Sequence, residues 1–156
     1  MNTKSRIQGP RTTRHLEQLQ ELIRGTLEPP AVAKLVGLEF ISIEMGHSVF
    51  EMSAGPQHAN PMGTLHGGIV CDLADAALGT AMASTLEDDE SFTTLDLAVK
   101  FLKPIWTARL RATADLVKRT RSLGLVECAV TDEKGSLVAR VYSSCMVLRG
   151  DDAKGR

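Results

Sequence analysis

Residues 66 to 84 read His-Gly-Gly-Ile-Val-Cys-Asp-Leu-Ala-Asp-Ala-Ala-Leu-Gly-Thr-Ala-Met-Ala-Ser. This segment is long enough for a helix of about five turns, and it is apolar on nearly every side. A helix of that kind has no polar, solvent-exposed face, so other parts of the protein must surround it. We therefore predict a buried central helix from His66 to about Ser84 that begins at two glycines.

The segments on either side of this helix have the character of strands. Leu38 to Met45 and Ser48 to Ser53 are rich in β-branched and aromatic residues around Gly46, which predicts a hairpin. After the helix, turn signals separate four more apolar segments with strand-like composition. These predicted strands are Phe92 to Leu102, Arg109 to Lys118, Leu123 to Thr131 and Leu137 to Leu148.

The order of these elements predicts the α+β class. No connection in the second half is long enough for a crossover helix, so the sheet should be antiparallel and wrapped around the central helix. Thr13 to Arg24 has an apolar stripe at helical spacing and is expected to form an amphipathic N-terminal helix. We expect one domain over residues 13 to 149, with flexible ends at residues 1 to 12 and 150 to 156.

Composition excludes two classes of partner. The 18 Lys and Arg residues balance the 19 Asp and Glu residues, so no broad field attracts nucleic acid or anionic lipid. The longest apolar stretch, Gly67 to Met82, is short for a membrane span and is interrupted by two aspartates. With three cysteines that lack metal or redox spacing, we expect a soluble cytoplasmic protein with reduced structural thiols.

The glycines at the start of the central helix have two interpretations. Gly67 and Gly68 leave the first backbone N–H groups uncovered at the positive end of the helix dipole, which suits a developing oxyanion. Alternatively, the glycines serve only tight packing.

Asp75 favours the chemical interpretation. It lies among apolar helix residues, where a carboxylate is costly unless it is hydrogen-bonded or functional, whereas Asp72 is explained by its place near the helix N-terminus. Gly67 and Asp75 are about 12 Å apart along the axis, because eight residues separate them. One substrate can meet both groups only if a second subunit supplies Asp75, so the hypothesis requires at least a homodimer.

Three further polar residues are candidates with simpler alternatives. The amide of Asn60 could orient a water or a carbonyl, although Asn60 before Pro61 is also typical of a turn. Thr94 shares a strand face with Asp96, and both could simply face solvent. His66 could be an acid or base, a ligand, or a residue that shapes the turn. No second His or Cys stands at metal spacing from it, so no metal site is expected.

Three basic residues stand at one predicted turn between strands, in Lys118-Arg119-Thr120-Arg121-Ser122. Such a cluster is usually a solvated turn, but it is also the best candidate for meeting phosphates. A Ser or Cys nucleophile is poorly supported, because the sequence has no Gly-x-Ser-x-Gly elbow and no local cysteine signature.

The run from Asn60 to Gly68, followed by Asp75 and by a strand that ends at Lys103-Pro104, resembles the phenylacetate-degradation (PaaI) type of hotdog thioesterases. It is also similar to mammalian thioesterase superfamily member 2. The resemblance implies a hotdog fold, a homodimer that is commonly a dimer of dimers, and hydrolysis of acyl-CoA thioesters. No cofactor is implied, because coenzyme A is part of the substrate.

The resemblance also assigns roles to residues. Gly67 would supply the amide that polarises the carbonyl, and Asp75 of the partner subunit would be the nucleophile or general base. Asn60 would orient carbonyl or water, His66 belongs to the same motif, and Thr94 would position the water. We expect Gly68, Arg119, Arg121 and Ser122 to contact coenzyme A. Two alternatives stay open: a non-catalytic acyl-CoA sensor, and a hotdog hydratase or dehydratase.

Overall fold

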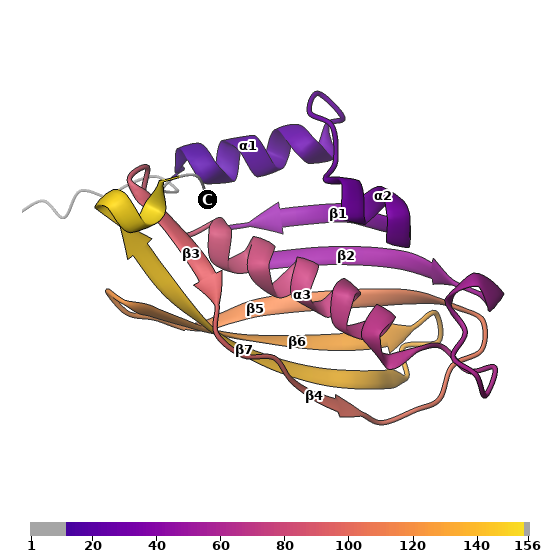
Figure 1. Cartoon of the computed structure of the whole chain (residues 1–156). Coiled ribbons are helices and arrows are strands. Elements are labelled where there is room, and N and C mark those ends of the chain that lie inside the picture. Colours follow the sequence, from indigo (N-terminus) through magenta and orange to yellow (C-terminus); the bar gives the residue numbers. More distant parts are fainter. Residues whose placement is uncertain (1–11, 155–156) are drawn as a thin grey trace, which may run out of the picture.

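The computed structural model describes residues 12 to 154 and shows one curled sheet with a long helix across its concave side (Figure 1). The helices are α1 (Arg14–Ile23), α2 (Ala31–Val36) and α3 (Gly67–Ala83), and η1 (Pro56–His58) and η2 (Gly150–Ala153) are short 3₁₀ turns. The strands are β1 (Leu38–Glu44), β2 (His47–Ala54), β3 (Glu90–Thr94), β4 (Ala98–Phe101), β5 (Ala108–Arg119), β6 (Leu123–Asp132) and β7 (Leu137–Arg149).

All strand pairs of the sheet are antiparallel, as the short connections predicted. The strand order is β1-β2-β5-β6-β7-β3, and β4 also pairs with β7. The helix α3 packs against β2, β5, β6 and β7, so its apolar side chains and those of the sheet form one core. Leu73, Leu78 and Met82 of α3 have no exposed surface. The prediction of a central helix inside a curled sheet is therefore confirmed.

The expected hairpin and N-terminal helix are also present. β1 and β2 pair around a turn at Gly46, whose φ of +75° favours glycine. Thr13 caps α1, because its hydroxyl accepts a hydrogen bond from the Leu16 N–H at 3.2 Å. The helix α2 was not predicted. It has only six residues, and the prolines before it favoured an irregular segment.

The prediction of one strand from Phe92 to Leu102 is wrong, because the chain leaves the sheet between β3 and β4. Asp96 replaces the missing ladder: its Oδ1 accepts the Ser144 N–H at 2.8 Å, and its carbonyl accepts the Ser143 hydroxyl at 2.9 Å. A side chain thus satisfies a backbone group that a continuous strand would have paired. Asp96 therefore does not share a strand face with Thr94.

Two expectations fall partly beyond the described residues. Residues 1 to 11 of the N-terminal segment predicted to be flexible, and residues 155 and 156 of the tail, lie outside them. Within residues 12 to 154, no helix combines the length and the apolar character needed to cross a membrane.

Candidate active site

Two backbone hydrogen bonds fix the loop immediately before α3. The Leu65 N–H donates to the Ile105 carbonyl at 2.6 Å, and the His66 N–H donates to the His58 carbonyl at 2.9 Å. His66 is the N-cap of α3, where its Nδ1 accepts the Gly68 N–H at 2.9 Å. His66 therefore shapes the helix start and occupies the amide of Gly68.

The neighbouring amide remains open. Within residues 12 to 154, no acceptor pairs with the Gly67 N–H, which is the first N–H of the helix proper. It combines an unpaired donor with the positive end of a helix of 17 residues. Such a donor suits an oxygen that gains negative charge during a reaction.

Packing around both glycines is also tight. A Cβ at Gly67 would lie 3.0 Å from Cζ of Phe101, and a Cβ at Gly68 would lie 2.9 Å from Nδ1 of His66. The two interpretations of the glycines are therefore compatible: tight packing removes the side chains that would cover the amide.

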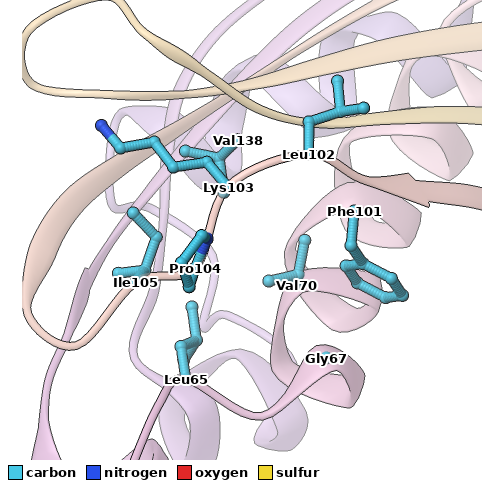
Figure 2. A pocket seen from close by; sticks show the side chains of 9 residues that line it. All are labelled: Leu65, Gly67, Val70, Phe101, Leu102, Lys103, Pro104, Ile105 and Val138. Carbon is cyan, nitrogen blue, oxygen red and sulfur yellow. The ribbon is translucent and has the colours of Figure 1, made fainter.

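A pocket of about 400 Å³ opens beside Gly67, and we call it the Gly67 pocket. Figure 2 shows Phe101 next to the first turn of α3 and Leu65, Pro104 and Ile105 on the other side. Val70, Leu102, Lys103 and Val138 complete the lining. Lys103 forms an ion pair with Asp132, so the wall near the open amide is largely apolar. Apolar walls strengthen any hydrogen bond that forms there.

Asp75 lies on the side of α3 that the sheet leaves uncovered, and it is exposed in the single chain. The sheet covers the α3 face that carries Leu73, Ala77 and Leu78, whereas Asp72 and Asp75 point away from that face. An apolar helix sequence does not say whether its own chain or another covers each side.

The surroundings of Asp75 nevertheless disfavour the ionised form of its carboxyl group. Partial burial against neighbouring atoms raises the pKa of Asp75, and the negative charge of Asp72 raises it further. The carboxylate is thus reachable from outside but poorly solvated on its inner side. A pKa raised in this way is typical of a carboxyl group that takes up a proton during catalysis.

Thr94 lies on the same side of the sheet as this carboxylate. It pairs with Cys145 in the ladder between β3 and β7, and residues directly opposite one another present their side chains to the same face. Burial raises the pKa of the Cys145 thiol, and the negative charge of Asp75 raises it further. A hydrogen bond with the Thr94 hydroxyl lowers the same pKa. The strand pairing thus places Thr94 beside a buried thiol whose pKa the charge of Asp75 also affects.

Asn60 organises the loop that leads to α3. Its side-chain oxygen accepts the Met62 N–H at 2.9 Å, and its side-chain nitrogen donates to the Thr64 hydroxyl at 2.8 Å. Its backbone also pairs with Thr64 and Gly63. The turn interpretation of Asn60 is confirmed, and the structure shows it as a residue that holds the helix start in place.

The basic turn lies far from Gly67 in the same chain. It shares a surface hollow with Thr85, just beyond the C-terminal end of α3. Arg119 donates to Glu90 at 2.7 Å and Arg149 pairs with the same carboxylate, so Arg119 has a structural partner. Arg121 lines this hollow and is exposed, and the exposed Ser122 follows it in the chain. One chain does not bring the predicted phosphate-binding residues and the open amide together.

Sequence reasoning missed Phe101, whose ring stands against Gly67. A signal was available in the alternation of Val99 and Phe101 along the strand, but nothing in the sequence aligned that strand with the start of α3. In the part of the chain that the structure describes, no three His, Cys, Asp or Glu residues gather as metal ligands.

Residues 62–139 match the Thioesterase superfamily. The chain belongs to this family. The match contains the open amide of Gly67, Asp75 and Thr94, and it confirms the predicted enzyme class of thioester hydrolase.

Among the relatives of this thioesterase, acyl-coenzyme A thioesterase PaaI of Escherichia coli is 31% identical, over 72% of this chain and 79% of PaaI. A 1,4-dihydroxy-2-naphthoyl-CoA hydrolase of Listeria monocytogenes is 29% identical, over 72% of this chain and 89% of the hydrolase. The solved structure of E. coli PaaI superposes with a TM-score of 0.78 at 23% identity, over 90% and 98% of the two chains. The hotdog fold and the resemblance to PaaI-type thioesterases are confirmed.

Proposed function

We propose that the protein hydrolyses acyl-CoA thioesters to a free acid and coenzyme A, at sites that two subunits build together. The observation that carries this proposal is the placement on α3 of an unpaired amide at Gly67 and an exposed, poorly solvated carboxylate at Asp75. The names of the relatives support a coenzyme A thioester as the substrate.

The spacing of these two groups supports a dimer. They are about 12 Å apart along the α3 axis, too far for one carbonyl group to contact both. A second copy whose α3 runs antiparallel beside the first would bring its Asp75 opposite Gly67, with the twofold axis near Cys71. The face that it would cover is the one that the sheet of the single chain leaves open.

In the proposed reaction, the thioester oxygen accepts a hydrogen bond from the Gly67 N–H. The carboxylate of Asp75 takes a proton from water, the oxygen of that water bonds to the carbonyl carbon, and the C–S bond breaks to release the coenzyme A thiolate, which then gains a proton. Thr94 would position the water, and Asn60 and His66 would hold the amide in place. Removing one oxyanion donor typically slows turnover about 10²–10³-fold, and a positioned base contributes about 10²–10⁴-fold.

Direct attack by Asp75 is the other route to the same products. It would form an anhydride between the acyl group and the carboxylate, which water then opens. A single turnover in oxygen-18 water distinguishes the two routes: label in Asp75 supports direct attack, and label confined to the product acid supports general-base catalysis.

The decisive variants are Asp75→Asn and its matched control Asp72→Asn, one turn earlier on the same helix. Release of thiol from acyl-CoA should fall at least about 100-fold in Asp75→Asn, because the base is lost. The Asp72→Asn variant should keep its turnover at alkaline pH. Near-normal turnover in Asp75→Asn would refute the assignment, and tight acyl-CoA binding without thiol release by the native protein would indicate a sensor instead.

Three finer parts of the proposal concern the assembly, coenzyme A and the compartment. Val117, Leu125 and Tyr142 line a hollow on the sheet face away from α3, which supports a dimer of dimers. We assign the coenzyme A phosphates to Arg121 and Ser122, with Arg119 held beside them by Glu90. The free thiols of the three cysteines support the cytoplasm as the compartment.

A further inference from the structure

A second cavity, of about 550 Å³, lies between the two N-terminal helices and the central helix, and we call it the α1 cavity. Its walls come from α1, the loop after it, α2, the hairpin β1–β2, and α3. On α3 the lining residues are Ala76 and Thr80, so the cavity reaches the helix immediately beside Asp75. This volume is in the usual range for small-molecule sites.

The walls are apolar, apart from the carboxylate of Glu28 and the hydroxyl of Thr80. Among the described residues that line the cavity, Glu28 is the only one with a charge, and it is paired with Lys34. Phe40 and Phe50 stack with ring centroids 4.5 Å apart and planes within 9° of parallel, which gives the cavity a flat aromatic wall. Such walls disfavour carboxylated ligands, whose charge would lose water beside apolar side chains and the carboxylate of Glu28.

The N-terminal helix has apolar side chains that the core does not use. Leu16 is buried, but Leu19 and Leu22 on the same stripe are only half-buried and face the cavity. An amphipathic helix whose apolar stripe borders empty space gains stability if an apolar ligand fills that space.

We propose that the α1 cavity holds the acyl group of the substrate, and that this group is uncharged and apolar. This inference rests on the proposed function. A carbonyl carbon placed between Gly67 of one subunit and Asp75 of the other carries two substituents, the acyl group and the sulfur. The acyl group enters the cavity of the subunit that supplies Asp75, and the sulfur and pantetheine arm lie along the more open Gly67 pocket of the other subunit.

The consequence is a preference for longer apolar acyl groups. Each methylene that leaves water for such a cavity raises kcat/KM about fourfold. Octanoyl-CoA and phenylacetyl-CoA should therefore be hydrolysed at least about 100-fold more efficiently than acetyl-CoA, and malonyl-CoA should be a poor substrate.

Two substitutions on α2 form a matched pair. The side chain of Ala33 lines the cavity, whereas Ala31 is exposed and lies outside the lining. Ala33→Phe fills the space and should lower kcat/KM for octanoyl-CoA at least about tenfold while acetyl-CoA turnover changes less than about twofold. Ala31→Phe adds the same ring outside the cavity and should leave both values unchanged. An unchanged acyl preference in Ala33→Phe would overturn the inference.

A binding measurement tests the cavity assignment independently of turnover. Calorimetric titration of Asp75→Asn with octanoyl-CoA and acetyl-CoA reports occupancy without turnover. The expected result is tighter binding of octanoyl-CoA, lost when Ala33→Phe is added. If the native protein hydrolyses none of these thioesters, the proposed function fails while the titration still decides the cavity. Equal affinity for both thioesters would overturn the cavity assignment and leave the hydrolase proposal standing.

Discussion

At the scale of single residues, Asp75 should set the lower pH limit of activity. Its pKa is raised, mainly by partial burial and further by Asp72, and only the ionised carboxylate can accept a proton. The value of kcat/KM should therefore fall, as pH is lowered, at a pH above the ordinary range of an aspartate. Asp72→Asn removes one of the two causes, so it should move this limb to lower pH. A pH profile of the two proteins tests this, and an acid limb that does not move would contradict it.

Gly67 allows a second test at the same scale. An added Cβ would lie 3.0 Å from the tip of the Phe101 ring, which is exposed and can turn. Gly67→Ala should therefore fold but push the ring across the open amide, and turnover should fall by up to about 10²–10³-fold. Phe101→Ala in the same chain should restore part of that loss. If the double variant is as slow as Gly67→Ala, the ring is not what blocks the amide.

At the scale of elements, one buried hydroxyl joins the end of α3 to the β1–β2 hairpin. Ser84 Oγ accepts the Gly46 N–H at 2.7 Å and donates to the Ala81 carbonyl at 2.7 Å. Ser84→Ala leaves the Gly46 amide without this partner and should lower the free energy of unfolding by about 1–3 kcal/mol. Ser136→Ala, in an exposed turn, should change it little. Urea unfolding midpoints measure both, and equal midpoints would show that this link contributes nothing.

The elements also show what sequence could predict. The central helix was clear from its apolar run and glycine start, and its bounds agree with the structure within one residue. The break between β3 and β4 was not clear from the sequence, because the Asp96 side chain stabilises it and no Gly or Pro marks it. The exposure of Asp75 in the single chain could not be predicted, since the apolar periodicity of a helix does not show whether its own sheet or another chain covers each face. The α1 cavity depends on how three helices pack, which no local pattern records.

At the scale of the whole molecule, the proposed site should be completed only by mixing subunits. Gly67→Ala and Asp75→Asn each damage both sites of their own homodimer. A mixed dimer would contain one undamaged site, formed by Gly67 of one chain and Asp75 of the other. Because random exchange of equal amounts makes half of all dimers mixed, the mixture should recover about a quarter of native activity.

The control for this exchange is a chain that carries both substitutions. Mixed with the native protein, it forms dimers in which each site lacks either the amide or the carboxylate, so mixed dimers are inactive. With equal amounts of the two chains, native dimers are half of all dimers before exchange and a quarter after random exchange, so activity should fall to about one half of its value before exchange. If each chain instead carried a complete site, exchange would restore nothing in the first mixture and remove nothing in the second. The two mixtures thus decide whether Gly67 and Asp75 act across the subunit boundary, which is the feature that the spacing on α3 requires.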